Sequence, residues 1–339
     1  MNFRLFFTML STMAIIISSC KKEKDPEIPP VVVNPKVYVV GYLGTKACLW
    51  VDGKLSILSE PGLYSRAYDI KISGDDTFIC GFESKYAVYW KNGVRVRLSD
   101  STSNCTAEKI FISGTNMYII GYQDIDYFTS IPKFWVNGAD VPLSTIEDCR
   151  FTDVYVSGND VYILGYEKTV SDRYRPIVWK NGIAEYFTDG TVSTILNSVF
   201  VKGNDIYIAG YEIGSYDHGI ACYWKNSDKI YLPCDGFDSH TRSIFMNGDT
   251  LYIGGNYRDN ITADVIPVYW KNGVIQPIGH SDDFDCLYNS FFIYNNDVYA
   301  TGQQYNQGNK HKASYSKNGE YYSLCDTTIS VSGQGIFVK

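Results

Sequence analysis

A short motif that recurs along the chain constrains the fold most strongly. It joins an aromatic residue, two mostly apolar residues, a glycine and a fifth, usually aromatic residue. The seven copies are Tyr38–Tyr42, Phe78–Phe82, Tyr118–Tyr122, Tyr162–Tyr166, Tyr207–Tyr211, Tyr252–Asn256 and Tyr299–Gln303. Their glycines are 40, 40, 44, 45, 45 and 47 residues apart, which lies in the period range of propeller blades.

The tryptophans follow the same period. All six share one repeat position, at Trp50, Trp90, Trp135, Trp179, Trp224 and Trp270, and Ser316 takes that position in the seventh copy. A large ring repeated at one place in six blades predicts packing between neighbouring blades rather than a cofactor cage.

Tight turns divide each repeat into four strands. Pairs such as Asn92-Gly93 favour type I′ hairpins, because both residues tolerate positive φ, and pairs such as Gly74-Asp75 mark a second turn. The strands of one repeat are A (Ile70–Ser73), B (Phe78–Phe82), C (Ala87–Trp90) and D (Val94–Leu98).

The two ends of the repeat region complement each other. It begins with a B strand, Val37–Tyr42, and finishes with an A strand at 335–339. Pairing the last strand with the first would close a ring and remove exposed edges, whereas an open solenoid would need capping repeats. A composition of 15% aromatic residues and 29 glycines also suits strands and turns. We therefore predict an all-β fold, a seven-bladed β-propeller of four-stranded antiparallel blades over 37–339, closed by the C-terminal strand.

The N-terminal residues predict export and a lipid anchor. Residues 1–19 contain a short basic start, an apolar run and small residues, which is typical of a signal peptide. Ile17-Ser18-Ser19-Cys20 resembles the lipobox of bacterial lipoproteins, so Cys20 is the expected lipidation site. Residues 20–36 mix prolines and charges and predict an extended tether. We expect an exported protein, lipid-anchored to the outer membrane and exposed at the cell surface, that contacts the bilayer only through this anchor.

Composition and motifs also exclude several functions. The formal net charge of −7 argues against nucleic-acid binding. The sequence contains no nucleophile elbow, phosphate loop, His-Glu-x-x-His or dinucleotide fingerprint, so we expect neither a cofactor nor a metal site. Cysteines at equivalent positions of different blades are predicted to be too far apart to pair, and most are expected to be buried and free.

One face of the propeller is expected to carry the function. Strand direction places the B–C and D–A loops on the same face, and the B–C loops vary most in length and content. Loops on a rigid scaffold are usual binding sites, and exposed aromatic rings suit a sugar face or a protein hot spot. The candidate ligand-binding residues are Tyr127, Phe128, Tyr174, Tyr216, Tyr257 and Tyr305, together with His218 and His280.

The repeats also resemble a known group of proteins. The Tyr-Ile-x-Gly-Tyr strand and the Tyr-Trp-Lys-Asn-Gly hairpin at Tyr89–Gly93 and Tyr269–Gly273 resemble repeats of uncharacterised propeller lipoproteins of Bacteroidetes and, more distantly, kelch-type blades. The resemblance concerns the scaffold, and a fold does not define a function.

Three functions are compatible with the sequence. We expect a non-catalytic, monomeric propeller that presents its variable loops to a glycan or protein ligand. A polysaccharide hydrolase or lyase is the first alternative, using Asp217 or Asp283 with His218 or His280. A structural subunit of an envelope complex is the second.

Overall fold

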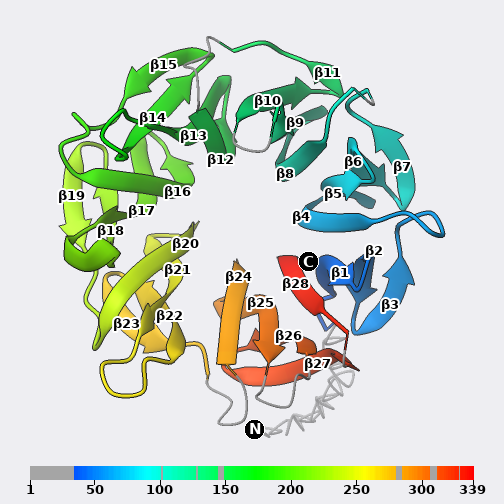
Figure 1. The fold of residues 1–339 in the computed structure, drawn as a ribbon. Coiled ribbons are helices and arrows are strands. Elements are labelled where there is room, and N and C mark those ends of the chain that lie inside the picture. Colours follow the sequence, from blue (N-terminus) through cyan, green and yellow to red (C-terminus); the bar gives the residue numbers. More distant parts are fainter. Residues whose placement is uncertain are drawn as a thin grey trace, which may run out of the picture. The chain divides into compact units, whose positions relative to one another are not determined.

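A computed structural model describes residues 34–100, 102–126, 129–143, 149–279, 285–305, 311–327 and 329–339. The region from Pro35 to Lys339 is one compact unit. It contains seven four-stranded sheets, in which neighbouring strands are antiparallel. The sheets are arranged in a ring (Figure 1), and the cavities lined by the strands nearest its centre form a central channel. The predicted seven-bladed β-propeller is therefore confirmed. No helix among the described residues is long and apolar enough to cross a bilayer.

The blades follow one another along the chain, and the strands of each blade are hydrogen-bonded in the order A, B, C, D. Blade 1 is β28 (Val331–Val338), β1 (Val37–Leu43), β2 (Lys46–Val51) and β3 (Lys54–Ile57). Blade 2 is β4 (Ser65–Ser73), β5 (Asp76–Glu83), β6 (Tyr86–Lys91) and β7 (Val94–Arg97). Blade 3 is β8 (Cys105–Ser113), β9 (Asn116–Asp124), β10 (Ser130–Val136) and β11 (Ala139–Asp140). Blade 4 is β12 (Cys149–Ser157), β13 (Asp160–Lys168), β14 (Tyr174–Lys180) and β15 (Ile183–Tyr186).

The remaining blades have the same plan. Blade 5 is β16 (Ser193–Lys202), β17 (Asp205–Ile213), β18 (Gly219–Lys225) and β19 (Asp228–Tyr231), with a short 3₁₀ turn, η1 (Ser215–Asp217), in its B–C loop. Blade 6 is β20 (Phe237–Asn247), β21 (Thr250–Arg258), β22 (Val265–Lys271) and β23 (Val274–Pro277). Blade 7 is β24 (Asp285–Tyr294), β25 (Asp297–Tyr305), β26 (His311–Lys317) and β27 (Glu320–Thr327).

The ring closes as the complementary ends predict. Strand β28 pairs with β1 in antiparallel register, with Val39 opposite Ile336. Beyond the strands, the backbone N–H of Lys36 donates to the carbonyl of Lys339 at 2.8 Å. The A strands of all blades lie nearest the centre of the ring (Figure 1). Side chains on the channel side of the A strands therefore determine what the channel can bind.

The asparagines of the C–D hairpins have two roles in the blade. Asn92 and Gly93 have φ values of 51° and 79°, as a type I′ turn requires. The Asn92 side chain also accepts a hydrogen bond from the backbone N–H of Thr77 in the B strand at 2.8 Å. The same bond recurs in other blades, as from Met117 to Asn137 at 2.8 Å. The repeated asparagine thus fixes both the hairpin and its contact with strand B.

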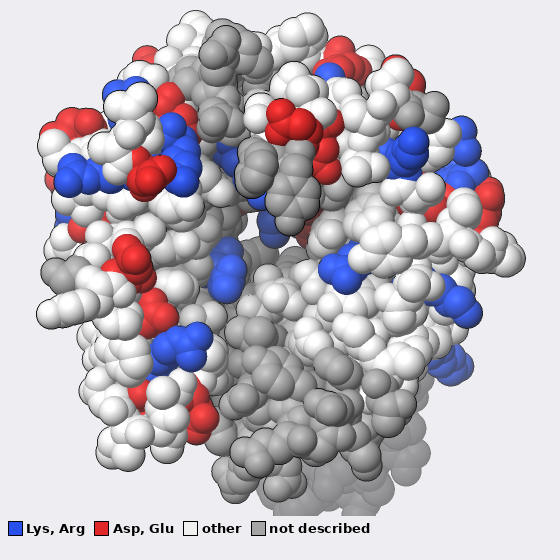
Figure 2. Space-filling view, in the orientation of Figure 1, with Lys and Arg blue, Asp and Glu red and all other residues white. Residues whose placement is uncertain are grey.

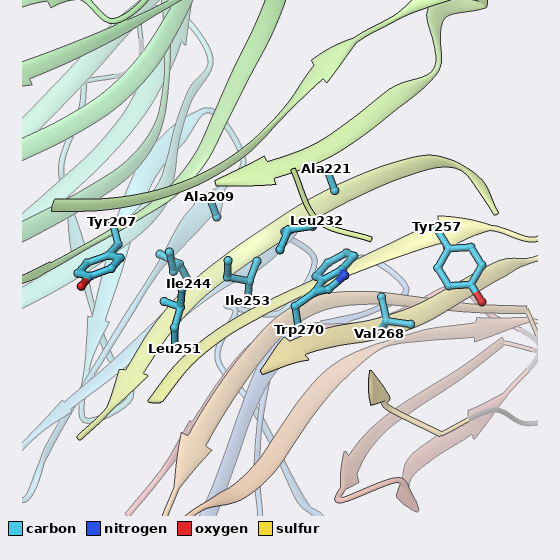
Figure 3. Packing of buried hydrophobic residues seen from close by; sticks show 10 residues of the cluster. All are labelled: Tyr207, Ala209, Ala221, Leu232, Ile244, Leu251, Ile253, Tyr257, Val268 and Trp270. Atoms are coloured by element: carbon cyan, nitrogen blue, oxygen red, sulfur yellow. The ribbon is translucent and has the colours of Figure 1, made fainter. Parts of the chain in front are cut away.

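The tryptophans pack between blades, as predicted. Trp270 of blade 6 is fully buried in a cluster with Ala221 and Leu232 of blade 5 (Figure 3), and its indole N–H donates to the carbonyl of Pro233 at 2.6 Å. In blade 7, where Ser316 replaces the tryptophan, Tyr321 on the neighbouring strand donates its hydroxyl to the carbonyl of Gly279 at 2.6 Å. Tyr321 therefore makes the bond to the preceding blade that a tryptophan makes elsewhere.

The glycine of the repeated motif is required by a β-bulge in strand A. In blade 3, Ala107 pairs with Gly121 and Lys109 pairs with Ile120, so Glu108 is the extra, bulged residue. A Cβ on Gly121 would overlap the carbonyl oxygen of Thr106. All seven A strands have a register shift at the equivalent position. The motif therefore marks the place where each A strand bulges.

Candidate functional site

The seven bulged residues meet in the central channel. They line one cavity of about 340 Å³, together with Lys109, Arg150, Phe151 and Tyr166. We call them the bulge ring: Tyr68, Glu108, Thr152, Asn197, Arg242, Asn289 and Gln334. Strand direction places this ring on the side of the channel nearer the B–C and D–A loops. The channel mouth is therefore lined by one side chain of every blade.

Hydrogen bonds between blades hold part of the ring in place. Thr152 donates its hydroxyl to the carbonyl of Leu196 in the next blade at 2.6 Å. Asn197 donates to the carbonyl of Thr241 at 2.6 Å, and Asn289 donates to the carbonyl of Gly333 at 2.8 Å. These bonds orient the side chains before any ligand arrives, which lowers the entropic cost of binding.

Some of the charged groups that line this cavity are neutralised by their neighbours. The guanidinium of Arg150 lies 3.2 Å from the carboxylate of Glu108. Burial opposes the charge of Lys109, but attraction to Asp69 and Asp153 raises its pKa, so the ammonium stays protonated. Arg242 is exposed, and no described residue forms an ion pair with it. In the space-filling view, Lys and Arg side chains border the central hollow (Figure 2).

Two tyrosines add neutral hydroxyl groups to this cavity. Burial raises the pKa of Tyr68 to about 12, and burial also raises the pKa of Tyr166. Both phenols are therefore protonated at neutral pH and can donate hydrogen bonds. Tyr174, predicted as a loop residue, is the first residue of β14 and packs edge to face on Tyr166, with ring centroids 5.1 Å apart. One of the predicted aromatic residues is therefore joined to the channel lining.

A second cavity, of about 360 Å³, occupies the channel nearer the A–B turns. At one equivalent position of strand A, every blade except blade 2 contributes an aromatic ring to its wall. We call these six rings the aromatic collar: Phe111, Tyr155, Phe200, Phe245, Phe292 and Phe337. Successive ring centroids are 4.8 to 6.1 Å apart. Blade 2 contributes Lys71 at this level, and its ammonium lies 3.2 Å from Asp69. The channel thus has a polar section and an aromatic section.

Planar groups stack on the motif tyrosines beside the mouth. The Arg66 guanidinium lies 4.2 Å from the ring centre of Tyr42 in the preceding blade. Equivalently, the ring of His240 stacks on Tyr211 at 4.3 Å. Nε2 of His240 is 3.0 Å from the carboxylate of Asp238, yet burial lowers the pKa of His240. Motif tyrosines are therefore partly covered by the protein itself.

The structure brings together only some of the residues predicted to bind a ligand. Tyr216 is 93% exposed with φ of 60°, and its ring lies 6.4 Å from that of His218. His218 in turn packs against Phe237 at 5.0 Å. Tyr257 is only 9% exposed and belongs to the core between blades 5 and 6 (Figure 3), so it offers little ring surface to a ligand.

Other predicted residues cannot be placed in the same way. Tyr127, Phe128, His280 and the lipidation site Cys20 lie outside the described residues, and Tyr305 is described only as the last residue of β25. Within the described ranges, no three His, Cys, Asp or Glu side chains are grouped as metal ligands would be. Among the cysteines that the structure describes with side chains, five are buried, as expected for most of them: Cys48, Cys80, Cys105, Cys149 and Cys222. Cys234 and Cys325 are half-buried.

The bulge ring was not among the residues predicted from sequence. A signal for it is nevertheless present, because six of its members lie thirteen positions before the motif glycine of their blade, as Glu108 lies before Gly121. The seventh, Gln334, reaches its glycine, Gly41, only through ring closure.

Comparison with known proteins supports the propeller class and goes no further. No family model and no curated protein matches the chain. Among solved structures, a puromycin-hydrolyzing peptidase of Mycobacterium tuberculosis aligns with a TM-score of 0.56 at 7% identity, over 87% of this chain and 54% of that one. An acylaminoacyl peptidase of Pyrococcus horikoshii aligns with a TM-score of 0.55 at 14% identity, over 87% and 52%. The chain therefore spans about half the length of these peptidases.

A third similar structure is a propeller alone. It is the β-propeller domain of the Trilobed protease from Pyrococcus furiosus, with a TM-score of 0.54 at 12% identity, over 87% of this chain and 95% of that one. That domain is described as having an open velcro topology, whereas the present ring is closed by the pairing of β28 with β1. At these identities the likeness establishes the fold alone.

Proposed function

We propose that this protein is a non-catalytic binding propeller that holds the end of a glycan in the mouth of its central channel. The bulge ring carries this proposal, because it directs one side chain of each of the seven blades into one cavity. Amides and a hydroxyl held in place by hydrogen bonds to the next blade, together with neutral phenols, suit the many hydroxyl groups of a sugar. A cavity of about 340 Å³ is in the usual range for small-ligand sites.

The variable loops would extend this site outward. Tyr174 continues the cavity lining through its contact with Tyr166, and Tyr216 offers an exposed ring near His218. Such rings can stack on the apolar faces of further sugar units. Lipidation of Cys20 would hold the propeller at the outer membrane, consistent with the sequence of the N-terminus.

The first test is binding of the purified protein to a broad glycan array. Gln334→Trp places a bulky ring in the cavity, and Ser56→Trp adds the same ring on the exposed strand β3 as a matched control. We expect Gln334→Trp to abolish glycan binding and Ser56→Trp to retain it, with both variants folded by circular dichroism. Equal binding by the two variants would exclude the channel as the site.

Further outcomes distinguish the alternatives. A folded protein that binds no glycan would contradict the proposal and favour a protein ligand or a structural role, which co-purification of a stoichiometric partner would reveal. Release of reducing ends from a polysaccharide would contradict the non-catalytic role.

For the anchor, we expect Cys20→Ser to lose incorporation of radiolabelled palmitate and to leave the membrane fraction.

A further inference from the structure

The channel wall contains one more positive than negative group. The two cavities are lined by four cations, Lys71, Lys109, Arg150 and Arg242, and by three carboxylates, Asp69, Glu108 and Asp153. This is the opposite of the whole chain, whose net charge is −7. A local excess of positive charge around a cavity favours a negatively charged ligand, even in a protein whose net charge is negative.

The ion pairs within the channel wall show which cation has no carboxylate partner. Lys71 lies 3.2 Å from Asp69, and Arg150 lies 3.2 Å from Glu108. Lys109 is attracted to Asp69 and to Asp153. Arg242 alone among the four has no carboxylate partner among the described residues, and its side chain is exposed.

We infer that Arg242 binds a carboxylate of the ligand, so that the glycan recognised by the bulge ring carries a uronic acid. This inference rests on the proposed glycan-binding function and specifies its ligand class. The guanidinium of arginine presents two parallel N–H donors that match the two oxygens of a planar carboxylate. A single charge on the ligand also balances the single unpaired cation, whereas a phosphate monoester would bring about two.

The surrounding groups favour a sugar acid over the C-terminus of a peptide. Proteins that capture a peptide carboxylate commonly use a nest of backbone N–H groups. Around Arg242 the cavity instead offers side-chain groups, including the amides of Asn197 and Asn289 and the hydroxyl of Tyr68. These groups can address the ring hydroxyls that accompany a uronate.

The experiment compares paired ligands. Uronic-acid oligosaccharides are arrayed beside their carboxyl-reduced counterparts, which keep the same stereochemistry but lack the charge, and beside sulfated sugars and peptides with free C-termini. We expect binding to the carboxylated member of at least one pair and about 10- to 100-fold weaker binding to its neutral partner. Raising the ionic strength should weaken only the binding of the acidic member.

Arg242→Gln tests the assigned residue directly. We expect this variant to bind the acidic and neutral members of the pair equally, while Lys54→Gln, with the same charge change on the outer strand β3, keeps the preference. Preference for the acid in Arg242→Gln would overturn the assignment. Equal binding of both members by the unaltered protein would overturn the uronate inference but leave glycan binding intact. A preference for sulfated sugars or for peptide C-termini would also overturn it.

Discussion

Substitution of a motif glycine tests whether the bulge explains the repeat. In Gly121→Ala, the new Cβ would overlap the carbonyl oxygen of Thr106 and lie 2.9 Å from its carbonyl carbon and 3.0 Å from Cα of Ala107. These atoms belong to the backbone, so no side-chain rotation relieves the contact. Strands β8 and β9 must separate locally and weaken the hydrogen bonds of their ladder.

The magnitude follows from two contributions. Forcing a methyl group into a filled space typically costs about 1–3 kcal/mol, and each weakened backbone hydrogen bond adds about 1 kcal/mol. We therefore expect Gly121→Ala to lower the free energy of unfolding by about 3 kcal/mol or more. Glu108, the bulged residue opposite, would be displaced from the channel wall.

A second glycine of the same blade provides the control. Gly114 lies in the A–B turn with φ of 58°, and a Cβ there would have no atom within 4 Å. Gly114→Ala should cost only the strain of a left-handed alanine, about 1 kcal/mol. Urea unfolding, followed by fluorescence of the buried tryptophans, measures both variants. Equal destabilisation by the two substitutions, or a cost near zero for Gly121→Ala, would refute the link between motif and bulge.

Contacts within the blades lead to three further predictions. Tyr321→Phe should destabilise the fold by about 1 kcal/mol in urea unfolding, because its hydroxyl binds the carbonyl of Gly279, while Tyr322→Phe, which loses only a bond to Glu320 at the surface, should cost much less. Burial raises the pKa of Cys48 to about 12 and also raises that of Cys80. Mass spectrometry after iodoacetamide treatment at pH 8 should therefore find both thiols unmodified in the native protein, while half-buried Cys234 is labelled before them. Burial lowers the pKa of His240, so as the pH falls the imidazole is protonated in the unfolded chain before it is protonated in the folded protein. The free energy of unfolding should therefore decrease as the pH drops below about 6.5. His240→Gln should show a smaller decrease between pH 7 and 5.5, and an unchanged decrease would contradict this assignment.

The fold could be predicted from sequence because its determinants are local and repeated. The Asn92-Gly93 turn, with φ values of 51° and 79°, encodes a hairpin within a few residues. The tryptophans that share one repeat position mark the contact between neighbouring blades, as Trp270 shows. Even ring closure could be inferred, because the two termini supply complementary strands.

The site could be predicted only in part, because loop position does not reveal burial or direction. Tyr257 follows the motif of blade 6 closely, and its ring packs inward. Tyr216, in the loop of blade 5, is exposed with a left-handed backbone. Both look alike as loop tyrosines in the sequence. The difference depends on the path of each loop over the neighbouring blade, which repeat periodicity does not determine.

Within single strands of the channel wall, scaffold residues and residues of the proposed site lie only a few positions apart. Collar residues such as Phe245 lie three positions after bulge-ring residues such as Arg242, on the same strand and facing the same channel. The collar is aromatic in six blades, and its rings contact one another, so packing accounts for its uniformity. The bulge ring instead combines Tyr, Glu, Thr, Asn, Arg and Gln around a water-accessible cavity. Packing alone would not require such different side chains at seven equivalent positions, whereas recognition of an asymmetric ligand would.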